Sequence, residues 1–252
     1  MSMFAIARLD LKRLYVRPFA WTLAAITLAA LAGLWFLPNL GAFLAAQPKL
    51  ASEAGSLGYT DLVIAPHLLA FVQLSLLVSP LITMHAIAGE RRAHTLPLLF
   101  AAGLAPARIV LGKFLAALCY LWLLLILVAL LPMTLAHATS PDWGQFGAAL
   151  LGCALCVAAF AAIGIACSTF ASHPAVAATA ALLLVLILTM LDTGARISGV
   201  QSGWLDYLAL PTHLTPFMHG LVRTMDVIYF VLIVALSLAF AARRLASDKV
   251  RG

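Results

Sequence analysis

The sequence predicts an all-α integral membrane protein with six transmembrane helices. Hydrophobic residues make up 64% of the 252 residues and charged residues only 10%, which is more apolar surface than a soluble domain of this length can bury. Charge-free runs occupy residues 18–48, 62–89, 114–141, 143–191 and 227–242, and a helix needs about 20 residues to cross the hydrocarbon core. The 143–191 run is long enough for two spans, so five runs predict six helices.

The boundaries of these spans follow from turn residues and charges. Residues 167–174 combine small polar residues with Pro174, which favours a turn between the fourth and fifth spans. The last run is short, so we expect the sixth helix to continue past Asp226 and Arg243, with these residues at the two interfaces. The single domain, 1–252, then divides into an interfacial helix (1–17), spans 1 and 2 (18–88), a connecting segment (89–107), spans 3 to 5 (108–191), an extracytoplasmic loop (192–226), span 6 (227–244) and a tail (245–252).

The distribution of charge predicts the orientation. If both termini are cytoplasmic, twelve of the fifteen Lys and Arg residues lie on the cytoplasmic side and six of the nine acidic residues lie outside. Cytoplasmic loops retain Lys and Arg, so this arrangement is the favoured one. The net charge of +6 therefore reflects topology and attraction to anionic membrane lipids. It does not indicate binding to nucleic acid.

The first seventeen residues are predicted to form a helix that lies in the membrane interface. Apolar residues share one helical face, and charged residues occupy the others. The apolar face comprises Met3, Phe4, Ala7, Leu11, Leu14 and Tyr15, and the charged faces carry Arg8, Asp10, Lys12, Arg13 and Arg17. The alternative is an ordinary basic stretch in front of the first span. A cleavable signal peptide is not indicated, because the apolar run that follows is too long.

Catalytic and metal-binding patterns are weak in this sequence. Cys153 and Cys156 form a C-x-x-C pair inside a span, without a second pair or a nearby acid, so we interpret them as packing residues. The histidines are scattered, and neither H-E-x-x-H nor G-x-S-x-G occurs. Acids are absent from the middle of the spans, which disfavours a proton-coupled carrier. We therefore expect no metal site, no catalytic residue and an energy source outside the bilayer.

The segment between spans 2 and 3 has the pattern of a short apolar helix on the cytoplasmic side. Thr95 can cap this helix, and Gly103 can end it in a left-handed conformation. Its apolar residues are Leu96, Leu98, Leu99 and Phe100, and its basic neighbours are Arg91, Arg92 and Arg108. A helix of this kind exposes hydrophobic side chains unless a soluble partner covers them. The residues alone leave a second interpretation equally open, a surface turn whose leucines enter the lipid headgroups.

Glu90 precedes this segment, where the second span leaves the membrane. We expect its carboxylate to pair with Arg91, Arg92 or a cation of a partner, and so to set the angle of the short helix. The alternative is a solvated surface acid that contributes less than about 1 kcal/mol.

Two motifs resemble those of a known family. Residues 84–92 (M-H-A-I-A-G-E-R-R), then T-L at 95–96, L-L at 98–99 and I-V-L-G-K at 109–113 resemble the signature of type-2 ABC transporter permeases, the export-type membrane subunits. That signature reads E-R-x-x-G-T-L-E-L-L-L-x-x-P followed by I-V-x-G-K. Three positions depart from it, because His94 replaces a glycine, Pro97 a glutamate and Gly103 a proline.

The second motif lies near the C-terminus. His213, Phe217, Gly220, Asp226 and Tyr229 are similar to the H-x-x-x-F-x-x-G…D-x-x-Y-F pattern of the branch that includes gliding-motility and nitrous-oxide-reductase maturation permeases. We expect the loop that carries them to fold back on the outer leaflet and gate the exit, or to receive a periplasmic partner.

The resemblance implies a membrane subunit in the bacterial cytoplasmic (inner) membrane, paired with a second permease copy as a homodimer and with two copies of a cytoplasmic ABC ATPase. The G-x-x-x-x-G-K-[ST] phosphate loop is absent, so ATP and Mg²⁺ are expected on the partner and no cofactor on this non-catalytic chain. The predicted ATPase-coupling residues are Glu90, Arg91, Arg92, Thr95, Leu96, Leu98, Leu99, Phe100, Gly112 and Lys113.

The implied function is an ATP-driven exporter, in which ATP hydrolysis drives outward substrate movement or mechanical work on a periplasmic assembly. Two alternatives remain open from the sequence. The first is an autonomous secondary carrier or channel. The second is a membrane scaffold that anchors an ATPase complex without transport.

Overall fold

The computed structural model describes residues 3–16, 18–50, 58–101, 103–198 and 207–251. Every regular element in these ranges is helical. Six of the helices are long and apolar enough to cross a membrane, at Pro18–Gln47, Thr60–Arg92, Pro106–Met133, Trp143–Phe170, Pro174–Leu191 and Thr224–Lys249. The prediction of an all-α fold with six candidate spans is therefore confirmed.

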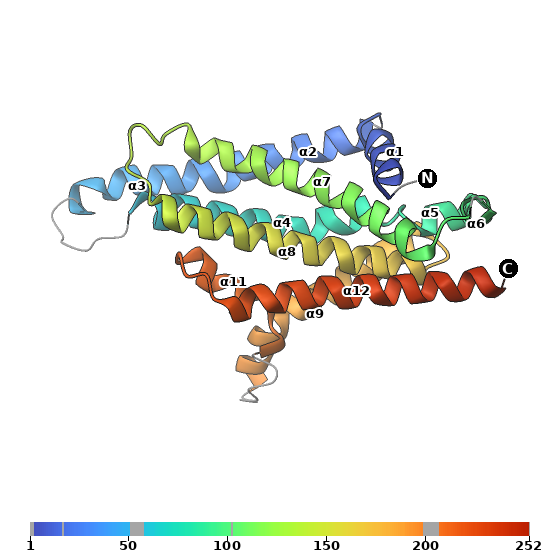
Figure 1. Cartoon of the computed structure of the whole chain (residues 1–252). Coiled ribbons are helices and arrows are strands. Elements are labelled where there is room, and N and C mark those ends of the chain that lie inside the picture. The colour runs from blue at the N-terminus through green and yellow to red at the C-terminus, as the bar shows by residue number, and fades with distance from the viewer. Residues whose placement is uncertain (1–2, 17, 51–57, 102, 199–206, 252) are drawn as a thin grey trace.

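The chain enters the bundle through a short helix and leaves it through a long one (Figure 1). Helix α1 (Met3–Val16) precedes the first span, which comprises α2 (Pro18–Ala30), the π-helix η1 (Leu31–Phe36) and α3 (Leu37–Leu50). The second span comprises the π-helix η2 (Thr60–Ile64), α4 (Ala65–Thr83) and, after a break, the short helix α5 (Ala88–Arg92). The short helix α6 (Leu96–Ala101) follows it. Then come α7 (Pro106–Met133), α8 (Trp143–Phe170), α9 (Pro174–Ser198), α11 (Leu210–Met218) and α12 (Thr224–Arg251).

Helix α8 lies at the centre of the bundle and packs against α4, α7, α9, α11 and α12. Its buried residues include many alanines, two glycines and two cysteines, whose small side chains let neighbouring backbones approach closely. A Cβ on Gly164 would lie 2.1 Å from Thr83 Oγ1 of α4, and one on Gly152 would lie 2.6 Å from Phe217 Cβ of α11. Cys153 and Cys156 are fully buried in this core.

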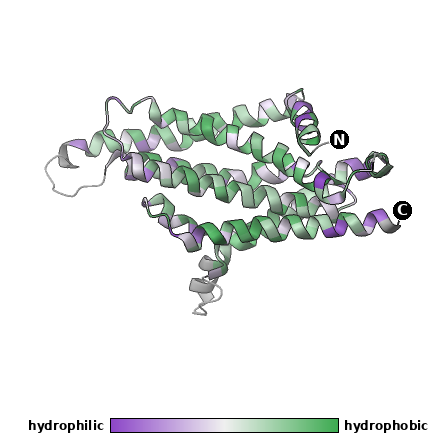
Figure 2. Ribbon diagram, viewed as in Figure 1, coloured by the Kyte–Doolittle hydropathy of each residue, from purple (hydrophilic) through white to green (hydrophobic). Residues whose placement is uncertain are grey.

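Both termini lie at the same end of the bundle (Figure 1), as six spans require. We call this end, which carries α1, α5, α6 and the last turns of α12, the proximal end. The opposite end, with α3, the α7–α8 connection and α11, is the distal end. Apolar residues cover the middle of the helices, and polar residues gather toward the two ends (Figure 2).

Several predicted boundaries agree with the structure. Helix α8 ends at Phe170 and α9 begins at Pro174, inside the turn predicted at 167–174. Helix α12 continues past both Asp226 and Arg243 and includes most of the predicted tail.

Other boundaries differ. The second span does not run unbroken to residue 88, because its helix stops at Thr83 and resumes as α5. The loop predicted at 192–226 contains the end of α9, helix α11 and the start of α12, and its residues 199–206 lie outside the described part of the chain.

Candidate functional site

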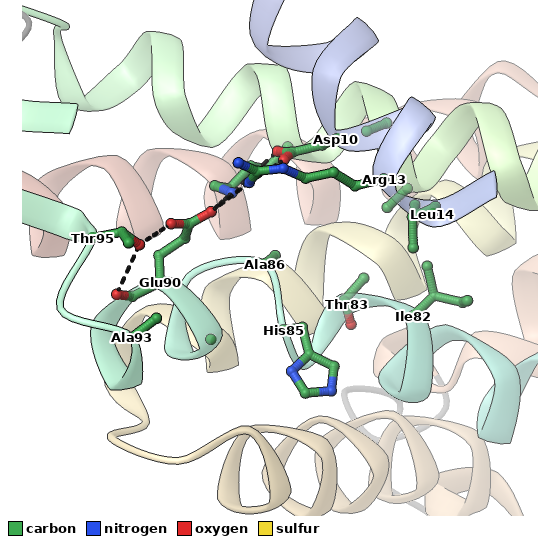
Figure 3. A pocket seen from close by; sticks show the side chains of 14 residues that line it. Asp10, Arg13, Leu14, Ile82, Thr83, His85, Ala86, Glu90, Ala93 and Thr95 are labelled. Atoms are coloured by element: carbon green, nitrogen blue, oxygen red, sulfur yellow. Dashed lines mark hydrogen bonds and ion pairs between the residues drawn. The ribbon is translucent and has the colours of Figure 1, made fainter. Parts of the chain in front are cut away.

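Four charged side chains from three helices meet at the proximal end (Figure 3). Lys113 of α7 places its Nζ 3.1 Å from Asp10 Oδ2 of α1 and 3.4 Å from Glu90 Oε1 of α5. Arg13 of α1 places its Nη1 3.1 Å from the same Glu90 oxygen and 3.7 Å from Asp10 Oδ1. We call these four residues the proximal cluster. Two acids face two bases, so the cluster is balanced in charge.

Burial makes this pairing necessary. The side chain of Lys113 is only 5% exposed, and those of Asp10 and Glu90 are 17% and 15% exposed. An ammonium group removed from water is tolerated only when it is paired and hydrogen-bonded. Glu90 is therefore not a solvated surface acid. Within the chain, the expectation that Glu90 pairs with Arg91 or Arg92 is wrong. Its partners are Arg13 and Lys113, which are distant in sequence.

Glu90 also contacts the start of α6. The hydroxyl of Thr95 donates to the Glu90 carboxylate and, at 3.3 Å, to the Glu90 carbonyl oxygen. The Thr95 carbonyl oxygen accepts from the amides of Leu98 and Leu99 in the first turn of α6. Glu90 is therefore hydrogen-bonded to the residue that precedes α6. That Glu90 sets the angle of the short helix stays a prediction.

The turn that leads into α6 contains a strained residue. His94 has a φ of 54°, in the left-handed region that glycine adopts most readily. At this position the resembled signature has glycine, so the backbone geometry explains why glycine suits it. Gly103, with a φ of 72°, ends the short helix in the left-handed conformation that the sequence predicted.

Helix α6 is anchored on one side and exposed on the other. Leu96 is buried, and Leu99 and Phe100 are half-buried against the core. Leu98 is 69% exposed. Pro97 beside it is also exposed, so this side of α6 is apolar and uncovered in the described part of the chain.

Arg91, which the sequence assigned to partner contact, faces the interior of the proximal end. It donates through Nη1 to the carbonyl oxygen of Ala171 at 2.9 Å, and through Nη2 it pairs with Asp248 of α12. Arg91 therefore connects α5 to the α8–α9 turn and to the C-terminal helix. Arg92 is exposed beside it.

Ser168 of α8 holds the break between α4 and α5, and sequence reasoning did not assign it this role. Its Oγ accepts from the amides of Ile87 and Ala88, both at 3.0 Å, and donates to the Met84 carbonyl oxygen at 3.2 Å. One hydroxyl thus satisfies backbone groups that the interrupted helix would leave without partners. No sequence pattern indicated this role, because the bonds cross about eighty residues of chain.

Gly112 and Lys113 together attach α1 to α7. A Cβ on Gly112 would lie 2.9 Å from Ile6 Cβ and 3.1 Å from the Met3 carbonyl oxygen, so glycine permits this close approach. Lys113 then pairs with Asp10 one turn further along α1. The I-V-x-G-K motif therefore docks the N-terminal helix. Ile6 is the one buried residue of α1 and was missed in the predicted apolar face, whereas Phe4 is exposed.

The five residues of the second motif come together at the distal end. His213 Nδ1 lies 2.7 Å from Asp226 Oδ1, and both side chains are almost completely buried. Its Nε2 lies 2.8 Å from the Tyr207 carbonyl oxygen, which can only accept, so Nε2 carries a hydrogen. Tyr229 stacks on the imidazole with ring centroids 3.9 Å apart and donates to the Leu208 carbonyl oxygen. The contact between histidine and aspartate thus joins α11 to α12.

Phe217 and Gly220 complete the distal site by joining α11 to α8. The Phe217 ring is fully buried against Gly152. Gly220, with a φ of 80°, turns the chain beside Gln145, whose Nε2 donates to the Met218 carbonyl oxygen and to Asp61. The predicted gate residues are therefore a packed and hydrogen-bonded unit.

Six helices long and apolar enough to cross a membrane, with a short exposed helix at one end and a packed helical cap at the other, indicate a multi-pass membrane protein. Residues 39–221 match the family described as ABC-2 family transporter protein. The match covers more than half of the chain, and the chain belongs to this family. No curated protein matches the chain. The protein is thus a membrane subunit of an ABC transporter, a class that associates with an ABC ATPase.

Proposed function

We propose that this chain couples ATP hydrolysis by a separate cytoplasmic ATPase to work across the membrane, with α6 as the coupling helix. The observation that carries the proposal is the burial of α6. Leu96 is buried in the membrane domain, whereas Leu98 on the same short helix is exposed. One side of α6 is fixed to the membrane domain, and the other is free for a soluble partner. In this proposal the proximal end is cytoplasmic, as the distribution of basic residues predicts.

The contacts of α6 and α5 provide two routes by which movement reaches the spans. Thr95 and Glu90 connect α6 to Arg13 of α1 and Lys113 of α7. Arg91 connects α5 to α12 and to the α8–α9 turn. A displacement of α6 by the ATPase would therefore move several spans together, as packed helices shift nearly as rigid bodies.

The complete assembly in this proposal is a homodimer of the permease with two ATPase subunits that bind ATP and Mg²⁺, in a bacterial inner membrane. The stroke moves a substrate outward or drives a periplasmic assembly. The packed unit of His213, Phe217, Gly220, Asp226 and Tyr229 supports placement in the branch with gliding-motility and nitrous-oxide-reductase maturation permeases. In this proposal α11 is the extracytoplasmic gate.

The test is Leu98→Asp in the full chain, co-expressed with its ATPase. The expected result is loss of the co-purifying ATPase and of its stimulation by the permease, because a carboxylate cannot enter an apolar pocket without a partner. Leu221→Asp is the matched control, since Leu221 is 53% exposed at the distal end. ATPase that binds but turns over at the same rate with Leu98→Asp would support the scaffold alternative. Solute movement in liposomes by the chain alone, without ATP, would support the carrier alternative.

A further inference from the structure

An apolar groove runs between α9 and α12 on the outside of the bundle. Both helices pack against α8, which forms the floor of the groove. The groove has a volume of about 560 Å³ and is lined by apolar side chains such as Phe170, Val176, Leu184, Leu236 and Phe240. Leu236 and Phe240 are 68% and 60% exposed. It lies along two membrane spans, so the hydrocarbon of the bilayer faces it.

One end of the groove carries positive charge. The rings of Phe170 and Phe240 stack with centroids 5.0 Å apart, and the Arg244 guanidinium lies 5.5 Å from the centre of the Phe170 ring. Arg244 is 34% exposed, and its buried Nε has no hydrogen-bond partner among the described residues. Asp248 approaches its Nη2 only to 3.7 Å and is bound more closely by Arg91.

Further basic residues lie on the last turns of α12. Arg243 and Lys249 are exposed on the same helix, α12. Together with Arg244, these cations outnumber Asp248, so the last turns of α12 carry a net positive charge. Figure 2 shows the change from apolar to polar residues along the last turns of α12.

We propose that this groove binds one acyl chain of an anionic phospholipid whose phosphate is held by Arg244. Arginine is suited to this role because its planar guanidinium matches phosphate oxygens and is weakly hydrated. A transmembrane helix of a second copy fits the space less well. A helix is about 10 Å across, and it brings no phosphate for Arg244 to hold. A single acyl chain is thinner and can follow the groove along its length.

The test is native mass spectrometry of the purified full chain with dioleoylphosphatidylglycerol or dioleoylphosphatidylcholine. We expect one phosphatidylglycerol per chain to be retained about fivefold more tightly than phosphatidylcholine, the effect of one basic residue on an anionic headgroup. Arg244→Gln should remove this preference, and Ala180→Trp should displace both lipids, because Ala180 lines the groove. The matched controls are Arg108→Gln and Ala25→Trp, whose side chains are exposed on α7 and α2, away from the groove.

Three results would overturn the proposal: equal retention of the two lipids by the unaltered chain, a preference that survives Arg244→Gln, or lipid retention unchanged by Ala180→Trp. A photoreactive benzophenone amino acid at position 180 provides an independent readout in membranes. It should crosslink to lipid. A crosslink to a second copy of the chain would instead identify the groove as a protein interface. None of these readouts depends on ATPase activity, so the proposal stands or fails separately from the coupling role of α6.

Discussion

Replacing Lys113 by methionine should destabilise the folded chain by about 3 kcal/mol, because two carboxylates then share one base. Removing one member of a buried ion pair costs about 3–5 kcal/mol. The lower end applies here, since Asp10 and Glu90 are 17% and 15% exposed and Arg13 stays 3.1 Å from Glu90. Methionine keeps much of the length and the apolar stem of lysine, so the change isolates the charge.

The assay is equilibrium unfolding of the full chain in mixed detergent and dodecyl sulfate micelles, followed by tryptophan fluorescence. A loss of 3 kcal/mol shifts the unfolding equilibrium about a hundredfold. The control is Arg108→Met, an exposed basic residue at the start of the same helix, which should change stability by less than about 0.5 kcal/mol.

A second variant separates charge pairing from packing. Glu90→Gln combined with Lys113→Met leaves Asp10 and Arg13 as a balanced pair, so the double variant should lose less stability than the sum of the two single variants. If Lys113→Met unfolds like the unaltered chain, or if the two effects simply add, the proximal cluster does not act as described.

Three further single variants test the other contacts by the same unfolding measurement, and two of them are also combined with a second substitution. Gly164→Ala should cost about 1–3 kcal/mol through overpacking. Adding Thr83→Ala should restore part of that loss, because it removes the hydroxyl oxygen that the new Cβ would meet 2.1 Å away but keeps the Cβ at 2.9 Å. Ser168→Ala should cost about 1–3 kcal/mol by leaving backbone groups at the α4–α5 break unsatisfied. It should also lower the ATPase turnover that the permease stimulates. An unchanged stability would mean that water replaces the hydroxyl. His213→Ala should cost about 3 kcal/mol because it leaves Asp226 buried without its partner. The double variant His213→Ala with Asp226→Asn should cost less than His213→Ala alone. Equal losses of stability in the single and double variants would exclude a coupled pair.

Local patterns in the sequence were sufficient for much of the fold. Runs of apolar residues predicted the number of spans, and Pro174 and Gly103 marked ends of helices that the structure places at the same positions. These signals act over a few residues, through hydrophobicity and backbone conformation, so they can be interpreted without knowledge of the packing. The motif residues near the C-terminus, His213, Phe217, Gly220, Asp226 and Tyr229, also lie together in the structure.

The partners of the charged residues could not be predicted in this way. Glu90 was expected to pair with its neighbours in sequence, but its cations come from α1 and α7. Arg91 was expected to face a partner protein, but its carboxylate partner lies 157 residues away on α12. Asp10 is the one acid among the basic residues of the first helix, and its partner Lys113 lies on α7.

The sequence by itself determined that this chain is a six-span membrane protein with a short apolar helix between spans 2 and 3, because burial of apolar surface in lipid depends on composition and spacing. Only the tertiary structure decided which side chains meet. Ion pairs and hydrogen bonds between helices depend on the rotation and depth of each helix, and small residues such as Gly112 and Gly164 set these by allowing close approach. The proximal cluster, the Ser168 contacts and the groove beside Arg244 all arise at that level.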